Sequence, residues 1–284
     1  MRQVLLGFMF FPLWFGIGGG LTAQSISEWR TKANNGDTIA RLKMAECFAL
    51  GLDCKASQDS VWTYIKPLLK GKHPEACFLA GNALLRGQGM TKNIPEGLKY
   101  LEVSAEAGMV QAVRVLIELY SGKDAQNAFA DPQLAAKKSD VALFKVANRA
   151  SGLNDPMVSF YLGICYLEGK GVTANDSLAL HWLQHAAAWE YCEAYLVLGD
   201  VWFFGKTRKG YDLGKARQYY ALARHNSKCS IERKGEGMEG EMWVSRLFSQ
   251  VWNNLWFTSG YLQDWQVMLP VPEVKPKDFQ KKRY

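Results

Sequence analysis

The chain has few of the residues and motifs on which most enzyme and metal sites depend. It holds 4 His and 6 Cys among 284 residues, and no two cysteines form a Cys-x-x-Cys pair. This excludes a zinc ribbon and a thioredoxin-like redox motif. Ser-x-x-Lys does not occur, so the nucleophile arrangement of serine β-lactamases is missing. Gly205-Lys206-Thr207 does not complete a phosphate-binding loop, because GxxxxGK[ST] requires glycine where the chain has Asp200.

Excess charge of one sign is also scarce. The 34 Lys and Arg residues against 27 Asp and Glu give a net charge of +7, without the clustered basic stripe of a nucleic-acid binder. We therefore expect no nucleic-acid partner. With 48% hydrophobic and 21% charged residues, the composition predicts folded domains. It excludes the collagen-like, coiled-coil and multi-spanning membrane classes.

Residues 1–23 are typical of a secretory signal peptide. Arg2 is followed by an uncharged run from Val4 to Ile17 and then by small residues up to Ala23. The run is shorter than a membrane span, and Pro12 interrupts it. We expect cleavage after Ala23 and a secreted or periplasmic protein, in which disulfides can persist. The alternative is an uncleaved membrane anchor.

The rest of the chain repeats with a period of about 36 residues. Five apolar segments align on central positions spaced by 36, 36, 46 and 36 residues. Apolar residues five and one before each centre, and three after it, form one helical stripe. A small residue at the centre allows a neighbouring helix to approach closely, and a glycine near the segment end predicts a left-handed helix cap. The central positions are Ala45, Gly81, Ile117, Gly163 and Gly199.

A second helix is predicted after each of these segments. It runs through Trp62–Ile65 in the first unit, Leu98–Leu101 in the second and Leu180–Ala187 in the fourth. The third unit has ten extra residues, which we assign as eight in the loop around 124–132 and two at the turn 153–154. The pattern predicts an all-α fold, an α/α solenoid of about five helix–turn–helix repeats, whose stacking buries a continuous core. Glycines predicted to close the second helices are Gly71, Gly108 and Gly152.

Three stretches resemble the Sel1-like repeat, a relative of the tetratricopeptide repeat. Residues 160–172 (FYLGICYLEGKGV) and 178–187 (LALHWLQHAA) are similar to its pattern LGxxYxxGxGV followed by WY and AA pairs, and residues 79–90 (LAGNALLRGQGM) match as well. The resemblance covers Gly36 to Asn226. It departs from the pattern in the first unit, which has Asp53 in place of a turn glycine, and in the third, which has Ile117 in place of glycine.

The resemblance implies that the first helices line a concave surface. Side chains one turn away from the packing stripe would face a partner there, and their mixture of acids, amide, arginine and aromatics suits an extended peptide or a helix. The other interpretation is that these positions are solvent-exposed and bind nothing. The predicted partner-binding residues are Asn82, Arg86, Glu118, Tyr161, Asp200 and Phe204.

The function expected from these observations is an exported, non-catalytic protein–protein interaction scaffold. It would be a monomer without a cofactor, and its partner would be an unknown protein or peptide. The alternative is a cell-envelope hydrolase or an enzyme that interacts with β-lactams or peptidoglycan, since some exported members of the family have been linked to β-lactam binding. No nucleophile beside a base can be named from the sequence.

Two residue pairs have the spacing of a metal site or of a disulfide. His181 and His185 stand one helical turn apart, and Glu190, Cys192 or Glu193 could complete a metal site. The sequence HWLQH lacks the glutamate of a metalloprotease motif, so an exposed polar face is favoured and no metal is expected. We further predict a Cys47–Cys54 disulfide across the first glycine turn, with two buried thiols as the alternative.

The period ends after Asn226, so we divide the chain into a signal peptide (1–23), a repeat solenoid (24–226) and a C-terminal part (227–284). Residues 227–240 are polar and glycine-rich and are predicted as a loop. Residues 242–257 have apolar residues at helical spacing and are predicted as a helix that caps the solenoid. An aromatic docking face is the alternative, because of Trp243, Trp252 and two further tryptophans. The basic tail is predicted to be disordered, with possible contact to the envelope.

Overall fold

Helices form all the regular secondary structure of the residues that the computed structural model describes, which are 23–50, 57–87, 91–122, 132–230 and 233–245. The predicted all-α class is therefore confirmed. The elements are α1 (Ala23–Asn34), α2 (Thr38–Leu50), α3 (Gln58–Lys70), α4 (Pro74–Arg86), α5 (Ile94–Glu106), α6 (Val110–Ser121), α7 (Pro132–Ala135), α8 (Asp140–Arg149), the 3-10 turn η2 (Ser151–Leu153), α9 (Pro156–Glu168), α10 (Asp176–Ala188), α11 (Cys192–Phe204) and α12 (Leu213–His225).

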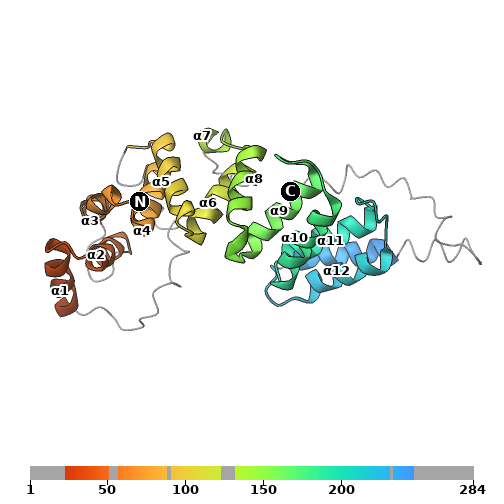
Figure 1. The fold of residues 1–284 in the computed structure, drawn as a ribbon. Coiled ribbons are helices and arrows are strands. Elements are labelled where there is room, and N and C mark those ends of the chain that lie inside the picture. The colour runs from red at the N-terminus through yellow and green to blue at the C-terminus, as the bar shows by residue number, and fades with distance from the viewer. Residues whose placement is uncertain (1–22, 51–56, 88–90, 123–131, 231–232, 246–284) are drawn as a thin grey trace, which may run out of the picture. The chain divides into compact units, whose positions relative to one another are not determined.

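The five predicted helix pairs are all present as α2/α3, α4/α5, α6/α8, α9/α10 and α11/α12 (Figure 1). The second helices begin where the sequence supplies a side-chain cap. Asn93 and Asn175 each accept a hydrogen bond from the backbone N–H three residues on. Gly87 and Gly169 end the first helices in the left-handed conformation, as predicted.

The chain divides into two compact units, residues 1–191 and 192–284, which are called the first unit and the second unit from here on. A single helix pair is called a repeat. In the first unit, the helices from α1 to α6 each pack against the next, and α6, α8, α9 and α10 continue the series. In the second unit, α11 packs against α12. Within the first unit the hairpins are thus stacked in sequence order, which is the arrangement that the 36-residue period predicted.

The central glycines allow the two helices of a pair to approach closely. A Cβ atom added to Gly81 would lie 2.7 Å from Leu101 Cγ, and one added to Gly163 would lie 2.6 Å from Leu183 Cγ. In the third pair the sizes are reversed, because the corresponding positions hold Ile117 and Ala147, both completely buried. A large residue therefore faces a small one in each of these pairs, and only the helix that carries the large one differs.

The turns between units differ from the prediction in detail. Asn154, rather than Gly152, has the positive φ (51°) after the third pair, and Lys72 (φ 53°), rather than Gly71, has it after the first. Gly108 (φ +85°) occupies the same place after the second pair, as predicted. The distance in sequence from the cap of a second helix to the start of the next first helix is the same in the third repeat as in the others. All ten extra residues of this repeat therefore precede Ser139, the N-cap of α8, and none lies at the turn 153–154, where two were predicted.

Two segments were predicted incorrectly or not at all. Residues 233–245 are helical, so the loop predicted for 227–240 is wrong beyond residue 232. The glycines of this segment pack instead of bending the chain, since a Cβ on Gly237 would lie 2.7 Å from the Tyr220 carbonyl oxygen and one on Gly240 would lie 2.6 Å from the Tyr220 ring. Helix α1, which packs on α2 through Ile26 and Ala33, had no counterpart in the prediction.

Several predictions fall outside the described residues. These are the signal peptide up to residue 22, the cap helix beyond residue 245 and the basic tail. Among the described helices, none combines the length and the apolar character required to cross a bilayer.

Candidate functional site

The predicted partner-binding residues differ widely in exposure. In the first unit, Arg86 at the end of α4 is exposed, Asn82 and Glu118 are half-buried, and Tyr161 on α9 is only 9% exposed. The Tyr161 ring packs edge-on against Phe160, at a centroid distance of 5.2 Å. Within this unit, Arg86 therefore offers a partner more accessible side-chain surface than Tyr161 does.

In the second unit, the two predicted residues are held by contacts within the chain. Asp200 is 5% exposed and accepts a hydrogen bond from the Tyr220 hydroxyl, at 2.7 Å. The Tyr220 ring lies close to Gly199 on one helix and Gly240 on another, which the absence of side chains permits. Phe204 is half-buried and packs edge-on against Phe203. Asp200 thus has a structural contact that the repeat pattern alone did not reveal.

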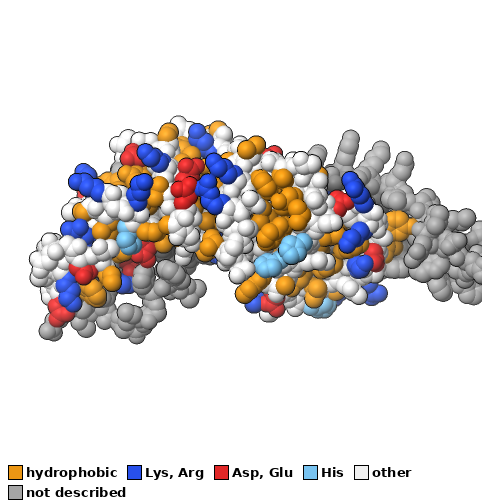
Figure 2. Space-filling model, viewed as in Figure 1, with side chains coloured by type: hydrophobic (Ala, Val, Ile, Leu, Met, Phe, Trp, Pro, Cys, Tyr) orange, Lys and Arg blue, Asp and Glu red, His pale blue; other side chains and the backbone are white. Residues whose placement is uncertain are grey.

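A groove lies between α5 and α8, above α6, with a volume of about 180 Å³. Its floor is formed by Val113, Leu116 and the Tyr120 ring. None of the predicted partner-binding residues lines the groove, although Glu118 lies on α6, the helix that forms its floor. Figure 2 shows acidic and basic side chains gathered over this part of the first unit.

Opposite charges face each other across the groove. The wall from α5 carries Glu102 and Glu106, and the wall from α8 carries Lys145 and Arg149. Arg149 and Glu106 form an ion pair in which both side chains are more than half exposed. The Tyr120 hydroxyl donates to Glu102 Oε1 at 3.2 Å, and burial together with the Glu102 carboxylate raises the pKa of Tyr120 to about 12. The phenol therefore stays protonated at neutral pH.

Asp155 connects α6 to the beginning of α9. Its Oδ1 accepts hydrogen bonds from the Met157 and Val158 N–H groups, so it caps α9. Its Oδ2 accepts from Arg114 on α6, with distances of 2.9 Å from Nε and 2.6 Å from Nη2. The carboxylate is 4% exposed, so its charge is balanced within the fold.

Asp155→Ala is expected to lower the free energy of unfolding of the first unit by about 2–3 kcal/mol, because the change removes both a helix cap and charge-assisted hydrogen bonds. Chemical denaturation followed by circular dichroism measures this. Breaking the exposed pair with Glu106→Ala is the matched control and is expected to cost less than about 1 kcal/mol. Equal losses in the two variants would contradict the structural role of Asp155.

A serine–histidine contact occurs between α9 and α10. Ser159 Oγ lies 3.0 Å from His185 Nδ1, but Ser159 is 1% exposed, so no substrate reaches the hydroxyl in this conformation. No group of three or more His, Cys, Asp or Glu residues among those described is arranged to hold a metal ion. Cys192, one of the residues considered as a third metal ligand, is in a disulfide.

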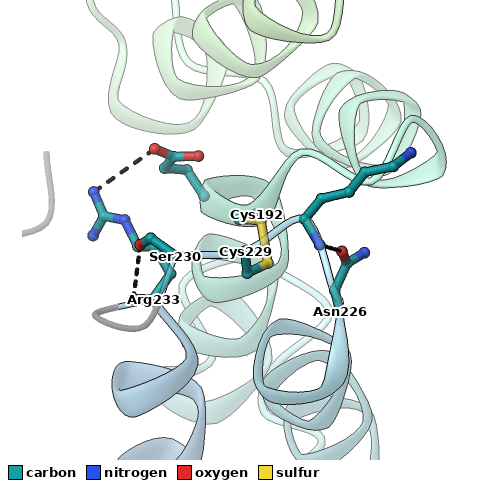
Figure 3. Close-up of a disulfide and its surroundings, with 7 residues drawn as sticks. Cys192, Asn226, Cys229, Ser230 and Arg233 are labelled. Atoms are coloured by element: carbon teal, nitrogen blue, oxygen red, sulfur yellow. Dashed lines mark hydrogen bonds and ion pairs between the residues drawn. A yellow bond between two sulfur atoms is a disulfide. The ribbon is translucent and has the colours of Figure 1, made fainter.

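The disulfide joins Cys192 to Cys229, with a Cα–Cα distance of 5.6 Å (Figure 3). It ties the first residue of α11 to the turn after α12. Lys228 N–H donates to Asn226 Oδ1 in this turn, and the Arg233 N–H donates to Ser230 Oγ. The sequence carried a signal for this pair that we missed, since 37 residues separate the two cysteines, close to one repeat period.

The other cysteines leave the predicted pairing open. Cys47 is buried in α2, whereas Cys54 lies outside the described residues, so the Cys47–Cys54 disulfide stays a prediction. Cys77 and Cys165 are buried thiols. Burial raises the pKa of both and brings that of Cys165 to about 12, which makes them unreactive in the folded protein.

Comparison with known proteins agrees with this fold. The family model for the Sel1 repeat matches residues 74–109, 157–188 and 192–226. An uncharacterized protein of Neisseria meningitidis serogroup B is 30% identical over 208 residues, which are 73% of this chain and 41% of that protein. This chain thus spans less than half the length of that relative.

Two solved structures were matched, of which the first shows the similarity in fold. A Sel1 repeat protein from Oxalobacter formigenes superposes with a TM-score of 0.56 at 23% identity, over 71% of this chain and 55% of that one. A protective antigen of uropathogenic Escherichia coli strains, which displays an SLR fold, has a TM-score of 0.42 at 18% identity, over 84% of this chain and 60% of that one.

The helix pairs and their close-packed glycines define the chain as an α-solenoid repeat protein. It contains three Sel1 repeats, which are formed by α4/α5, α9/α10 and α11/α12. These are the second, fourth and fifth predicted repeats. The first and third repeats form helix pairs of the same kind, although the family model does not match them.

Proposed function

We propose that the protein is an exported, non-catalytic scaffold that binds a segment of another protein. A Sel1-repeat fold and a disulfide in the second unit support this proposal. Disulfides persist in secreted and periplasmic proteins and are rare in reducing compartments, so the Cys192–Cys229 bridge favours export.

The partner segment is proposed to dock in the groove between α5 and α8. The observation that carries this is the combination of an apolar floor with an acidic wall on one side and a basic wall on the other. Such a groove suits a segment that places an apolar side chain between an acidic and a basic residue. The Arg149–Glu106 pair does not prevent this, because exposed ion pairs contribute little and can rearrange.

Asn82, Arg86 and Glu118 remain a proposed second contact surface on α4 and α6 of the first unit, and Phe204 on α11 remains a separate proposed contact residue of the second unit. Tyr161 and Asp200 were predicted with them, and we propose that each of these buried residues supports the first helix that carries it, within its own unit. The second surface and the groove can be separated experimentally by probes at Arg86 on α4 and Lys145 on α8, which are different helices.

Site-specific photocrosslinking in the native organism tests this function. A photoreactive residue is placed at Lys145 in the groove, at Arg86 on a first helix, or at the exposed Gln184 on α10 as a control. We expect one defined partner protein to crosslink from Lys145 and not from Gln184. Loss of this crosslink on charge reversal of Arg149 would support the groove. Equal crosslinking from all three positions would contradict it, whereas a product from Arg86 alone would move the site to the first helices.

Export is tested separately by mass spectrometry of the protein recovered from the cell exterior or periplasm. We expect the mature chain to begin at Gln24, because cleavage is predicted after Ala23. A chain that still begins at Met1 would contradict signal-peptide cleavage, without affecting the docking proposal.

A further inference from the structure

The solvent face of α10 carries two histidines one turn apart. His181 is exposed and His185 is half-buried, and Figure 2 shows histidine side chains gathered over this helix. Residues four apart on a helix have neighbouring side chains. The Trp182 ring packs edge-on against both imidazoles, at centroid distances of 5.2 Å from His181 and 6.1 Å from His185.

The hydrogen bonds around Ser159 determine which nitrogen of His185 is available. Ser159 Oγ lies 3.1 Å from the carbonyl oxygen of Asp155, four residues earlier in the same helix, and 3.0 Å from His185 Nδ1. A helical serine hydroxyl donates to that carbonyl, so Oγ accepts from the Nδ1–H group. This tautomer leaves the lone pair on Nε2. Metal-binding histidines are oriented in the same way, by donating their other N–H to a neighbouring group.

We propose that His181 and His185 together bind a divalent transition-metal ion. Imidazole nitrogens suit Ni²⁺, Zn²⁺ and Cu²⁺, and the absence of carboxylates from the pair disfavours Ca²⁺ and Mg²⁺. Two protein ligands leave the remaining coordination positions to water. The site is therefore an exchangeable surface site, unlike a closed structural zinc site with four protein ligands. Among divalent ions the affinity is expected to rise from Ni²⁺ to Cu²⁺.

Equilibrium dialysis of the untagged full chain against Ni²⁺, followed by metal analysis, tests the proposal. We expect one Ni²⁺ per chain, and at least about tenfold weaker binding in His181→Ala and in His185→Ala. Ser159→Ala is expected to weaken binding by about tenfold, because it removes the group that orients His185. His225→Ala is the matched control, since His225 is a single exposed histidine on α12, and it should leave Ni²⁺ binding unchanged.

A spectroscopic readout locates the ion. Cu²⁺ bound by this pair would quench Trp182, so part of the tryptophan fluorescence of the wild type should be lost and that part should be retained in the His181→Ala variant. Circular dichroism verifies that each variant is folded, and the exposed position of His181 keeps the test valid if His185→Ala unfolds. Absence of Ni²⁺ binding by the wild type, or unchanged binding in a folded His181→Ala variant, would overturn the proposal.

Discussion

Gly163→Ile is expected to destabilise the first unit by about 3 kcal/mol, and a second change, Leu183→Ala, is expected to restore much of that loss. The larger side chain at position 163 would collide with Leu183, whose Cγ lies 2.6 Å and whose backbone nitrogen lies 3.1 Å from an added Cβ. Overpacking of this kind costs about 1–3 kcal/mol and occasionally more. Leu183→Ala alone leaves a cavity and is expected to cost about 2–5 kcal/mol.

The expected rescue follows from the third helix pair. There Ile117 and Ala147 occupy the positions of Gly163 and Leu183, and both are completely buried. The double variant would reproduce that combination, so its loss should be about 2 kcal/mol or more below the sum of the two single losses, within the range of coupling between contacting residues.

Chemical denaturation of the full chain, followed by circular dichroism, measures this coupling. Gly152→Ile is the matched control, because a Cβ at Gly152 would meet no atom within 4 Å and its φ is not positive. It should change the stability little. Additive losses in the double variant would contradict the exchange of large and small residues between the two helices.

Loss of the Cys192–Cys229 disulfide is expected to destabilise the second unit by roughly 4 kcal/mol. The bridge closes a loop with a sequence separation of 37 residues, and closing a loop of that length removes this much chain entropy from the unfolded state. Reductant should therefore lower the denaturation midpoint of the wild type. The double variant Cys192→Ser/Cys229→Ser should already have the lower midpoint.

The same pair of proteins decides the untested Cys47–Cys54 pairing. If Cys192–Cys229 is the single bridge, the wild type denatured without reductant should expose four thiols, because its 6 cysteines include two in the bridge. A second bridge would lower the count to two, and the Cys192→Ser/Cys229→Ser variant would then still respond to reductant. A count of six would contradict both bridges.

The repeat architecture was predictable because its signals are local. A helix stripe, a capping side chain and a turn glycine each depend on residues within one or two turns, and the 36-residue spacing repeats all three. Two of the three matched repeats, α4/α5 and α9/α10, contain the stretches that resemble the family pattern in the sequence. The third repeat has the same fold although Ile117 replaces its central glycine, because Ala147 on the opposite helix leaves the space that Ile117 fills.

Two differences between the sequence-based expectations and the structure involve Tyr220. Glycines at 235, 237 and 240 are typical of a loop when only neighbours in sequence are considered. In the folded chain, Gly237 and Gly240 allow a helix to lie against Tyr220, a contact that no local pattern encodes. In the same way, Asp200 seemed accessible from its helical position, but it is buried beside Tyr220.

The amino-acid sequence alone determined the helical repeat, its period and the positions of most helix ends, because these follow from short-range spacing and backbone conformation. The tertiary structure decided which cysteines pair, which residue of each helix pair provides the bulk, and where a groove with charged walls lies. These features depend on atoms that meet only when helices pack, and helix packing is governed by the volume of side chains far apart in the chain.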